Sequence, residues 1–179
     1  SDETAMGDYP VEAVETMARI AREIERDETH FKPMIDMDMV SVNHEITAQL
    51  ARSAVRASTN LPVKYVVLDT KTGRTGRYLA AFRGRKTVMA VCYRLHAQRI
   101  LALSYGVVPI LRTQELSDKY HFLVDALEFI DQYRKLQDDD LMAIVGGSFG
   151  PDGGASYLEL ADVRGIRRRN EMIAAQNKR

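Results

Sequence analysis

Disulfide chemistry, membrane spans and a dominant net charge are all missing from this sequence. Its 179 residues include one cysteine, Cys92, so no disulfide can form within the chain, and a reducing compartment, the cytoplasm, is expected. Basic and acidic residues number 25 each, so no overall field favours nucleic acid or a membrane surface. No apolar run reaches the ~18 residues of a membrane-spanning helix. The N-terminal SDETAMGDYP is acidic, which is not typical of a signal peptide.

Metal-ligand patterns are also scarce. The four histidines are His30, His44, His96 and His121. No pair of them has metal-ligand spacing on a predicted helix, and with a single cysteine we expect no zinc site. Asp138–Asp140 lacks the alternating spacing of a calcium loop and is expected to be a solvated turn. Cys92 ends an apolar run, which favours a small buried hydrophobe over a nucleophile.

What the chain does contain is an alternation of strand-like and helix-like runs, in a composition typical of globular proteins (45% hydrophobic, 28% charged). The strand-like runs are Tyr65–Leu68, Thr87–Val91, Val107–Leu111, Leu141–Val145 and Tyr157–Leu160. The helix-like runs between them are Gly76–Arg83, Leu95–Ser104 and Lys119–Leu136. The first four strands are short and almost entirely apolar, as expected when helices cover both faces of a parallel sheet.

The last strand is expected to differ from the others in direction. It follows the loop GGSFGPDGGAS, which is too short to hold the crossover helix that a parallel return requires. The sequence therefore predicts an α/β fold, a three-layer sandwich with a mostly parallel five-stranded sheet whose last strand runs antiparallel at an edge.

Two further helices are predicted before this alternation. The first runs from Pro10 to about Glu25 with apolar residues at helical spacing, and the second runs from a cap at Ser41 to about Ser58. Asp27–Asp38 between them is polar and is expected to be a linker. The apolar face of the first helix needs a surface to pack on, so the chain is expected to begin inside a larger fold.

The polar loop after the first strand is the most informative candidate site. Strand, loop and helix follow one another directly, which aims the free N–H groups of the helix N-terminus at the loop. The loop offers three hydroxyls, a glycine and two cations: Thr70, Lys71, Thr72, Gly73, Arg74 and Thr75. Their order fits neither a P-loop nor a dinucleotide fingerprint. The loop is therefore either a phosphate site or an ordinary strand-to-helix turn with a capping threonine.

Two parts of the sequence resemble the pyruvate kinase family. SDETAMGDYPVEAVETMARIAREIE is similar to the family segment SGETAxGxYPxEAVxxMxxIxxxxE, which follows the last strand of the catalytic barrel and forms its last helix. The motifs VVLDTKTGRTGRYLAAFRGRKTVMAVC, RILALSYGVVPIL and VGGSFGPDGGASYLEL resemble the C-terminal domain of that family. The resemblance covers residues 1 to 163. It implies a barrel remnant and linker at 1–37, the C-terminal domain at 38–166 and a basic tail at 167–179.

The resemblance also implies a function. Pyruvate kinases transfer phosphate from phosphoenolpyruvate to ADP with Mg²⁺ and usually K⁺, and their catalytic groups belong to segments that this sequence does not contain. The C-terminal domain contributes an effector site and part of a tetramer interface. The loop matching Thr70–Thr75 holds an effector phosphate there, and a closing loop covers the effector. The closing-loop positions in this chain are Gly150, Gly153, Gly154 and Ser156. Expected partners are thus a phosphorylated small molecule, the chain's own catalytic barrel and further copies of the chain, with no catalytic residue in this part.

The chain departs from the family in three places. Members that bind a sugar bisphosphate use an arginine and a tryptophan from the segment matching Gln114–Asp125, where this chain has only Lys119 and His121 as candidates. A monophosphate effector, such as a sugar monophosphate or AMP, is therefore favoured. The closing loop ends in Gly154-Ala155-Ser156, with one hydroxyl fewer than is usual, and Asp2 replaces a family glycine.

Two other functions remain open at this level. The chain could be a small phosphatase or phosphotransferase that uses Asp69, at the end of the first strand, as its nucleophile. It could also be a passive structural domain without a ligand. The cluster at Arg164–Arg169 has no interleaved aromatic residues, so a solvated terminus is favoured over a nucleic-acid tail.

Overall fold

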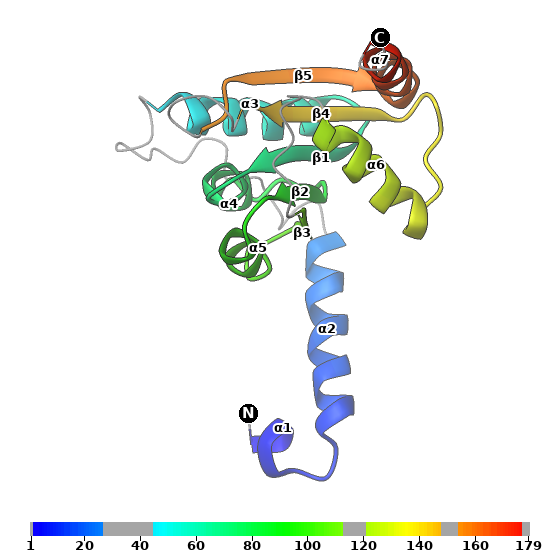
Figure 1. The fold of residues 1–179 in the computed structure, drawn as a ribbon. Coiled ribbons are helices and arrows are strands. Elements are labelled where there is room, and N and C mark those ends of the chain that lie inside the picture. Colours follow the sequence, from blue (N-terminus) through cyan, green and yellow to red (C-terminus); the bar gives the residue numbers. More distant parts are fainter. Residues whose placement is uncertain (1, 27–44, 113–120, 148–153, 177–179) are drawn as a thin grey trace. The chain divides into compact units, whose positions relative to one another are not determined.

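The computed structural model of the chain describes residues 2–26, 45–112, 121–147 and 154–176, in two compact units, Ser1–Lys32 and Pro33–Arg179 (Figure 1). The first unit contains helices α1 (Asp2–Met6) and α2 (Pro10–Arg26), and α2 begins at its proline as predicted. The predicted linker Asp27–Asp38 and the predicted cap Ser41 lie outside the described residues.

The second unit is built around one five-stranded sheet. In chain order its elements are α3 (Ile46–Asn60), β1 (Val63–Thr70), α4 (Arg74–Ala81), β2 (Val88–Cys92), α5 (Leu95–Leu101), β3 (Val107–Leu111), α6 (His121–Tyr133), β4 (Leu141–Gly146), β5 (Tyr157–Asp162) and α7 (Val163–Gln176). The strands lie in the order β3-β2-β1-β4-β5. The first four are parallel and β5 is antiparallel to β4 at an edge, which confirms the predicted sheet.

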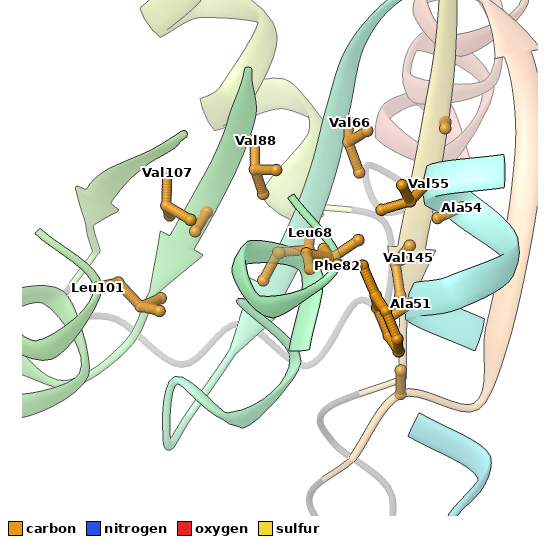
Figure 2. Packing of buried hydrophobic residues seen from close by; sticks show 14 of the residues in the cluster. Ala51, Ala54, Val55, Val66, Leu68, Phe82, Val88, Leu101, Val107 and Val145 are labelled. Carbon is orange, nitrogen blue, oxygen red and sulfur yellow. The ribbon is translucent and has the colours of Figure 1, made fainter. Parts of the chain in front are cut away.

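Helices cover both faces of the sheet and enclose two hydrophobic cores. Helices α3, α4 and α5 bury one core, in which Val66 and Leu68 of β1 meet Ala51, Phe82 and Leu101 (Figure 2). Helices α6 and α7 bury the other core around the alternate residues of the same strands. Because successive strand residues point to opposite faces, the nearly unbroken apolar runs supply both cores, and the predicted three-layer arrangement is confirmed.

Helix α4 begins earlier than its sequence pattern predicts. The expected helix covered Gly76–Arg83, whereas α4 covers Arg74–Ala81. Gly73 stands immediately before it with a φ of 82°, a left-handed conformation that glycine adopts without strain, so the chain turns into the helix at once. Arg83, with a φ of 49°, ends the segment. Two residues predicted to lie in the loop therefore belong to the first turn of α4.

The segment predicted to be a basic tail, 167–179, is helical up to residue 176. Helix α7 runs from Val163 to Gln176 directly after β5, and residues 177–179 lie outside the described part. Val163 and Ile166 are fully buried in the second core. The guanidinium of Arg167 binds the carboxylates of Asp138 at 2.7 Å and Asp131 at 3.0 Å. The prediction of a solvated terminus for Arg164–Arg169 is thus wrong for Arg167 and Arg169, because their guanidinium groups pair with carboxylates of other segments.

The two edges of the sheet differ in their backbone donors. Strand β3 contains Pro109, which pairs in register with Ala90 of β2 and has no N–H group. Prolines in sheets are tolerated at edge strands, and β3 is an edge. Strand β5 at the other edge contains no proline.

A candidate anion site at the carboxyl edge of the sheet

The predicted phosphate loop lies at the end of the central strand. Thr70 is the last residue of β1, whose neighbours are β2 and β4. The chain leaves β1 through α4 toward β2 on one side, whereas β4 lies on the other side and leads to β5. In open α/β sheets, ligands usually bind at the carboxyl ends of the strands where the strand order reverses in this way.

Two backbone donors of the loop are already engaged by loop hydroxyls. The N–H of Gly73 donates to Thr70 Oγ1 at 2.9 Å, and the N–H of Arg74 donates to Thr72 Oγ1 at 3.4 Å. Gly73, the residue before the helix, has no side chain that could cap the first N–H groups of α4. Part of the turn interpretation is therefore right, since threonines stabilise the turn. The N–H groups of Thr75 and Gly76 belong to the first helical turn, where α4 itself offers no acceptor.

The three threonines differ in their access to solvent. Thr70 and Thr75 are each 1% exposed, whereas Thr72 is exposed. Gly76 packs tightly against α5, because a Cβ atom there would lie 2.8 Å from Leu101 Cδ2. The start of α4 thus packs closely on α5, and Thr72 is the threonine of the loop whose side chain is open to solvent.

Arg74, one of the two predicted cations, is bound by a carboxylate that the sequence did not reveal. Its Nη2 lies 2.6 Å from Glu45 Oε1, and the Tyr78 hydroxyl donates a hydrogen bond to Glu45 Oε2. The hydrogen bond to Tyr78 and then the charge of Glu45 raise the pKa of Arg74. The hydrogen bond to Glu45, followed by burial, raises the pKa of Tyr78, so the phenol keeps its proton. Lys71, the other predicted cation, is partly buried in the loop.

The end of the predicted closing loop lies at the same edge of the sheet. The Ser156 N–H donates to the Gly146 carbonyl at 2.8 Å, beside the carboxyl end of β1. Gly154 lies against the first turn of α3, because a Cβ atom there would be 2.3 Å from Thr47 Oγ1. Gly150 and Gly153 lie outside the described residues. Gly154 and Ser156 are thus placed near α3, whose preceding residue, Glu45, reaches the phosphate loop.

Asp69, the nucleophile of the alternative enzyme, belongs to a different environment. It is 2% exposed. Strand alternation places Leu68 and Thr70 on the α4 face and Asp69 on the α6 face, away from the loop hydroxyls. On that face, burial and then the negative charge of Asp69 raise the pKa of Tyr93. A buried carboxylate on the opposite face is poorly placed to attack a phosphate ester held in the loop.

Other chemistry is sparse in the part of the chain that the structure describes. Within those ranges no group of three histidine, cysteine, aspartate or glutamate side chains is arranged to hold a metal ion. None of the described helices has the length and apolar character needed to cross a membrane. Of the four histidines, His96 and His121 are described, and His30 and His44 are not.

Comparisons with known proteins agree with this architecture. Residues 48–161 match the family described as pyruvate kinase, alpha/beta domain. The pyruvate kinase of Bacillus licheniformis is 30% identical over 99% of this chain and 32% of its own length. That of Borreliella burgdorferi is 29% identical over 91% of this chain and 34% of its own length. A pyruvate kinase structure from Cryptosporidium parvum has a TM-score of 0.75 at 22% identity, covering 91% of this chain and 32% of that one, which shows the same fold. The chain thus spans about a third of the length of these relatives.

Proposed function

The chain belongs to the pyruvate kinase family through its alpha/beta domain, and we propose that it is the regulatory part of such an enzyme. In this proposal the loop from Thr70 to Thr75 binds the phosphate group of a small effector, and the segment ending at Gly154 and Ser156 closes over it. The intact protein would transfer phosphate from phosphoenolpyruvate to ADP, with Mg²⁺ and K⁺ held in its catalytic barrel.

One observation carries the effector site. The N-terminus of α4, an eight-residue helix, stands at the carboxyl end of the central strand, beside an exposed threonine and two basic side chains. Helix N-termini favour anions because their free N–H groups and the helix dipole both point at the ligand. A passive domain would need neither the cations nor the position at the strand-order reversal.

A monophosphate fits the described residues better than a bisphosphate. A second phosphate would need another strong cation. His121, the first residue of α6, is the described candidate from the predicted segment, and Lys119 lies outside the described residues. An imidazole ring lacks the planar fork of donors with which an arginine binds two phosphate oxygens at once, so it holds a phosphate less strongly.

Binding should depend on the exposed hydroxyl and the helix start. We expect sugar monophosphates or AMP to bind the full chain in calorimetric titrations, and Thr72→Ala to weaken binding at least about tenfold through the loss of a charge-assisted hydrogen bond from its exposed hydroxyl. Thr87→Ala is the matched control, because Thr87 is exposed before β2 at the opposite end of the strands.

Three outcomes of this titration would count against the proposal or part of it. Failure of every compound to bind at millimolar concentration would leave the passive structural domain as the better description. Equal weakening by Thr87→Ala would locate binding elsewhere. Much tighter binding of fructose 1,6-bisphosphate than of every monophosphate would keep the loop but reject the monophosphate preference.

The isolated chain should have no pyruvate kinase activity. It spans about a third of the length of its relatives, and the family resemblance assigns the catalytic groups to the barrel and its lid domain. We expect no turnover of phosphoenolpyruvate and ADP with Mg²⁺ and K⁺ in an assay coupled to lactate dehydrogenase, with a full-length pyruvate kinase as the positive control. Turnover that is lost in the Asp69→Asn variant would instead support the enzyme built on Asp69.

We further propose that the chain forms an oligomer or packs on its own catalytic barrel. Val14, Met17, Ile20 and Ile24 line one face of α2, and each is more than half exposed. At ~25 cal/mol per Å², burying such a face would contribute a few kcal/mol. That gain supports a partner surface for α2, from a second copy or from the barrel of the intact enzyme.

A further inference from the structure

We propose that Glu45 is a built-in competitor of the effector phosphate: its carboxylate occupies Arg74, and an anion must displace it to bind fully. This inference rests on the effector site proposed above and concerns the regulation of that site. It makes Glu45 the residue that sets the concentration at which the site fills.

The Glu45 carboxylate binds side chains of α4 and does not cap the helix that it precedes. Glu45 immediately precedes α3, yet its carboxylate makes no capping hydrogen bond to that helix. It reaches to α4 instead, where one oxygen lies 2.6 Å from Arg74 Nη2 and the other accepts the Tyr78 hydroxyl. Arg74 and Tyr78 are one turn apart on α4, so a single carboxylate spans both. An anion at the first turn of α4 would meet a guanidinium that is already neutralised.

The exposure of the pair makes displacement feasible. The Arg74 side chain is 49% exposed and that of Glu45 is 24% exposed. Solvent and salt screen the pair from the side of the half-exposed guanidinium, although Glu45 Oε1 itself is buried. A phosphate dianion carries twice the charge of a carboxylate and can accept two parallel hydrogen bonds from a guanidinium, so it can take Arg74 from Glu45.

The test is a titration of the full chain with inorganic phosphate. Glu45→Gln keeps the size of the side chain and removes its charge, so we expect it to bind phosphate about tenfold more tightly than the wild type. Tyr78→Phe leaves every charge in place but removes the hydroxyl that anchors the carboxylate, so its affinity should lie between the two. In the Arg74→Ala background, Glu45→Gln should leave affinity unchanged within about twofold, because the competition acts through Arg74.

The outcomes separate this inference from the site on which it rests. Phosphate binding to the wild type without a gain in Glu45→Gln overturns the competition and leaves the site intact. A gain that persists without Arg74 also overturns it, since general charge repulsion would then explain the effect. Failure of every variant to bind phosphate overturns both. Should Glu45→Gln not fold, as judged by circular dichroism, unchanged affinity in Tyr78→Phe is sufficient to reject the inference.

Discussion

The thiol of Cys92 should react with a disulfide reagent at pH 8 about a thousandfold more slowly in the folded chain than in urea, because burial raises its pKa from 9.0 to about 12. The thiolate is the reactive form, and at pH 8 the folded protein keeps almost none of it. Cys92 is fully buried, so limited access slows the reaction further. The measurement is the rate of thionitrobenzoate release, with and without denaturant.

A relocated thiol provides the control for this experiment. In a Cys92→Ala, Ser53→Cys double variant, the cysteine stands at an exposed position of α3 and should react at nearly the same rate with and without urea. The contribution of the Cys92 thiol to the stability of the fold also depends on pH. The raised pKa favours the fold fully below pH 9, and this contribution is lost as the pH rises from 9 toward 12. Rapid labelling of the folded wild type at pH 8 would contradict this burial and show that the core is open at the carboxyl end of β2.

Replacement of Phe82 by alanine should lower the free energy of unfolding by about 3–5 kcal/mol. Phe82 immediately follows α4 and is fully buried in the first core, among residues of α3 and the central strands (Figure 2). The Arg52 guanidinium also lies 5.4 Å from the centre of its ring. Because surrounding strands and helices can collapse only partly, the cavity adds to the lost burial.

Urea denaturation followed by circular dichroism measures this loss. Tyr133→Ala is the matched control, because that aromatic side chain at the end of α6 is 73% exposed and should cost less than about 1 kcal/mol. A loss below about 1 kcal/mol for Phe82→Ala would contradict the packing of α4 on the sheet. It would also weaken the anion site, since α4 supplies the N-terminus on which that site depends.

The layered sheet could be predicted from the sequence because a short stretch of residues indicates each of its strands. The run Tyr65–Leu68 is apolar at every residue, and β1 indeed contributes alternate residues to both cores. The direction of β5 followed from the length of one loop, since no helix fits between Val145 and Tyr157. Each of these inferences needs only a short stretch of sequence and a rule about backbone geometry.

Only some of the residues of the candidate site could be predicted from the sequence. Arg74 and Gly73 are adjacent in the sequence and could be recognised together, but Tyr78 and Glu45 are 33 residues apart, and no periodicity connects them. The start of α4 was also missed, because the φ of Gly73 decides where the helix begins and the sequence alone allowed a longer loop. Arginines of α7 were likewise misassigned, since their acidic partners come from separate segments.

Pro109 has a consequence for how far the sheet can grow. A strand added beside β3 would face an edge interrupted at a residue without an N–H, whereas no proline interrupts the alternate N–H groups of β5 that point away from β4 between Tyr157 and Asp162. If two copies paired through β5, both would use the same strand, and a two-fold axis would relate them. Such a contact leaves neither β5 strand free for a third copy. With the opposite edge interrupted, such pairing ends at two chains, and the sheet lacks the second uninterrupted edge that fibrous growth requires.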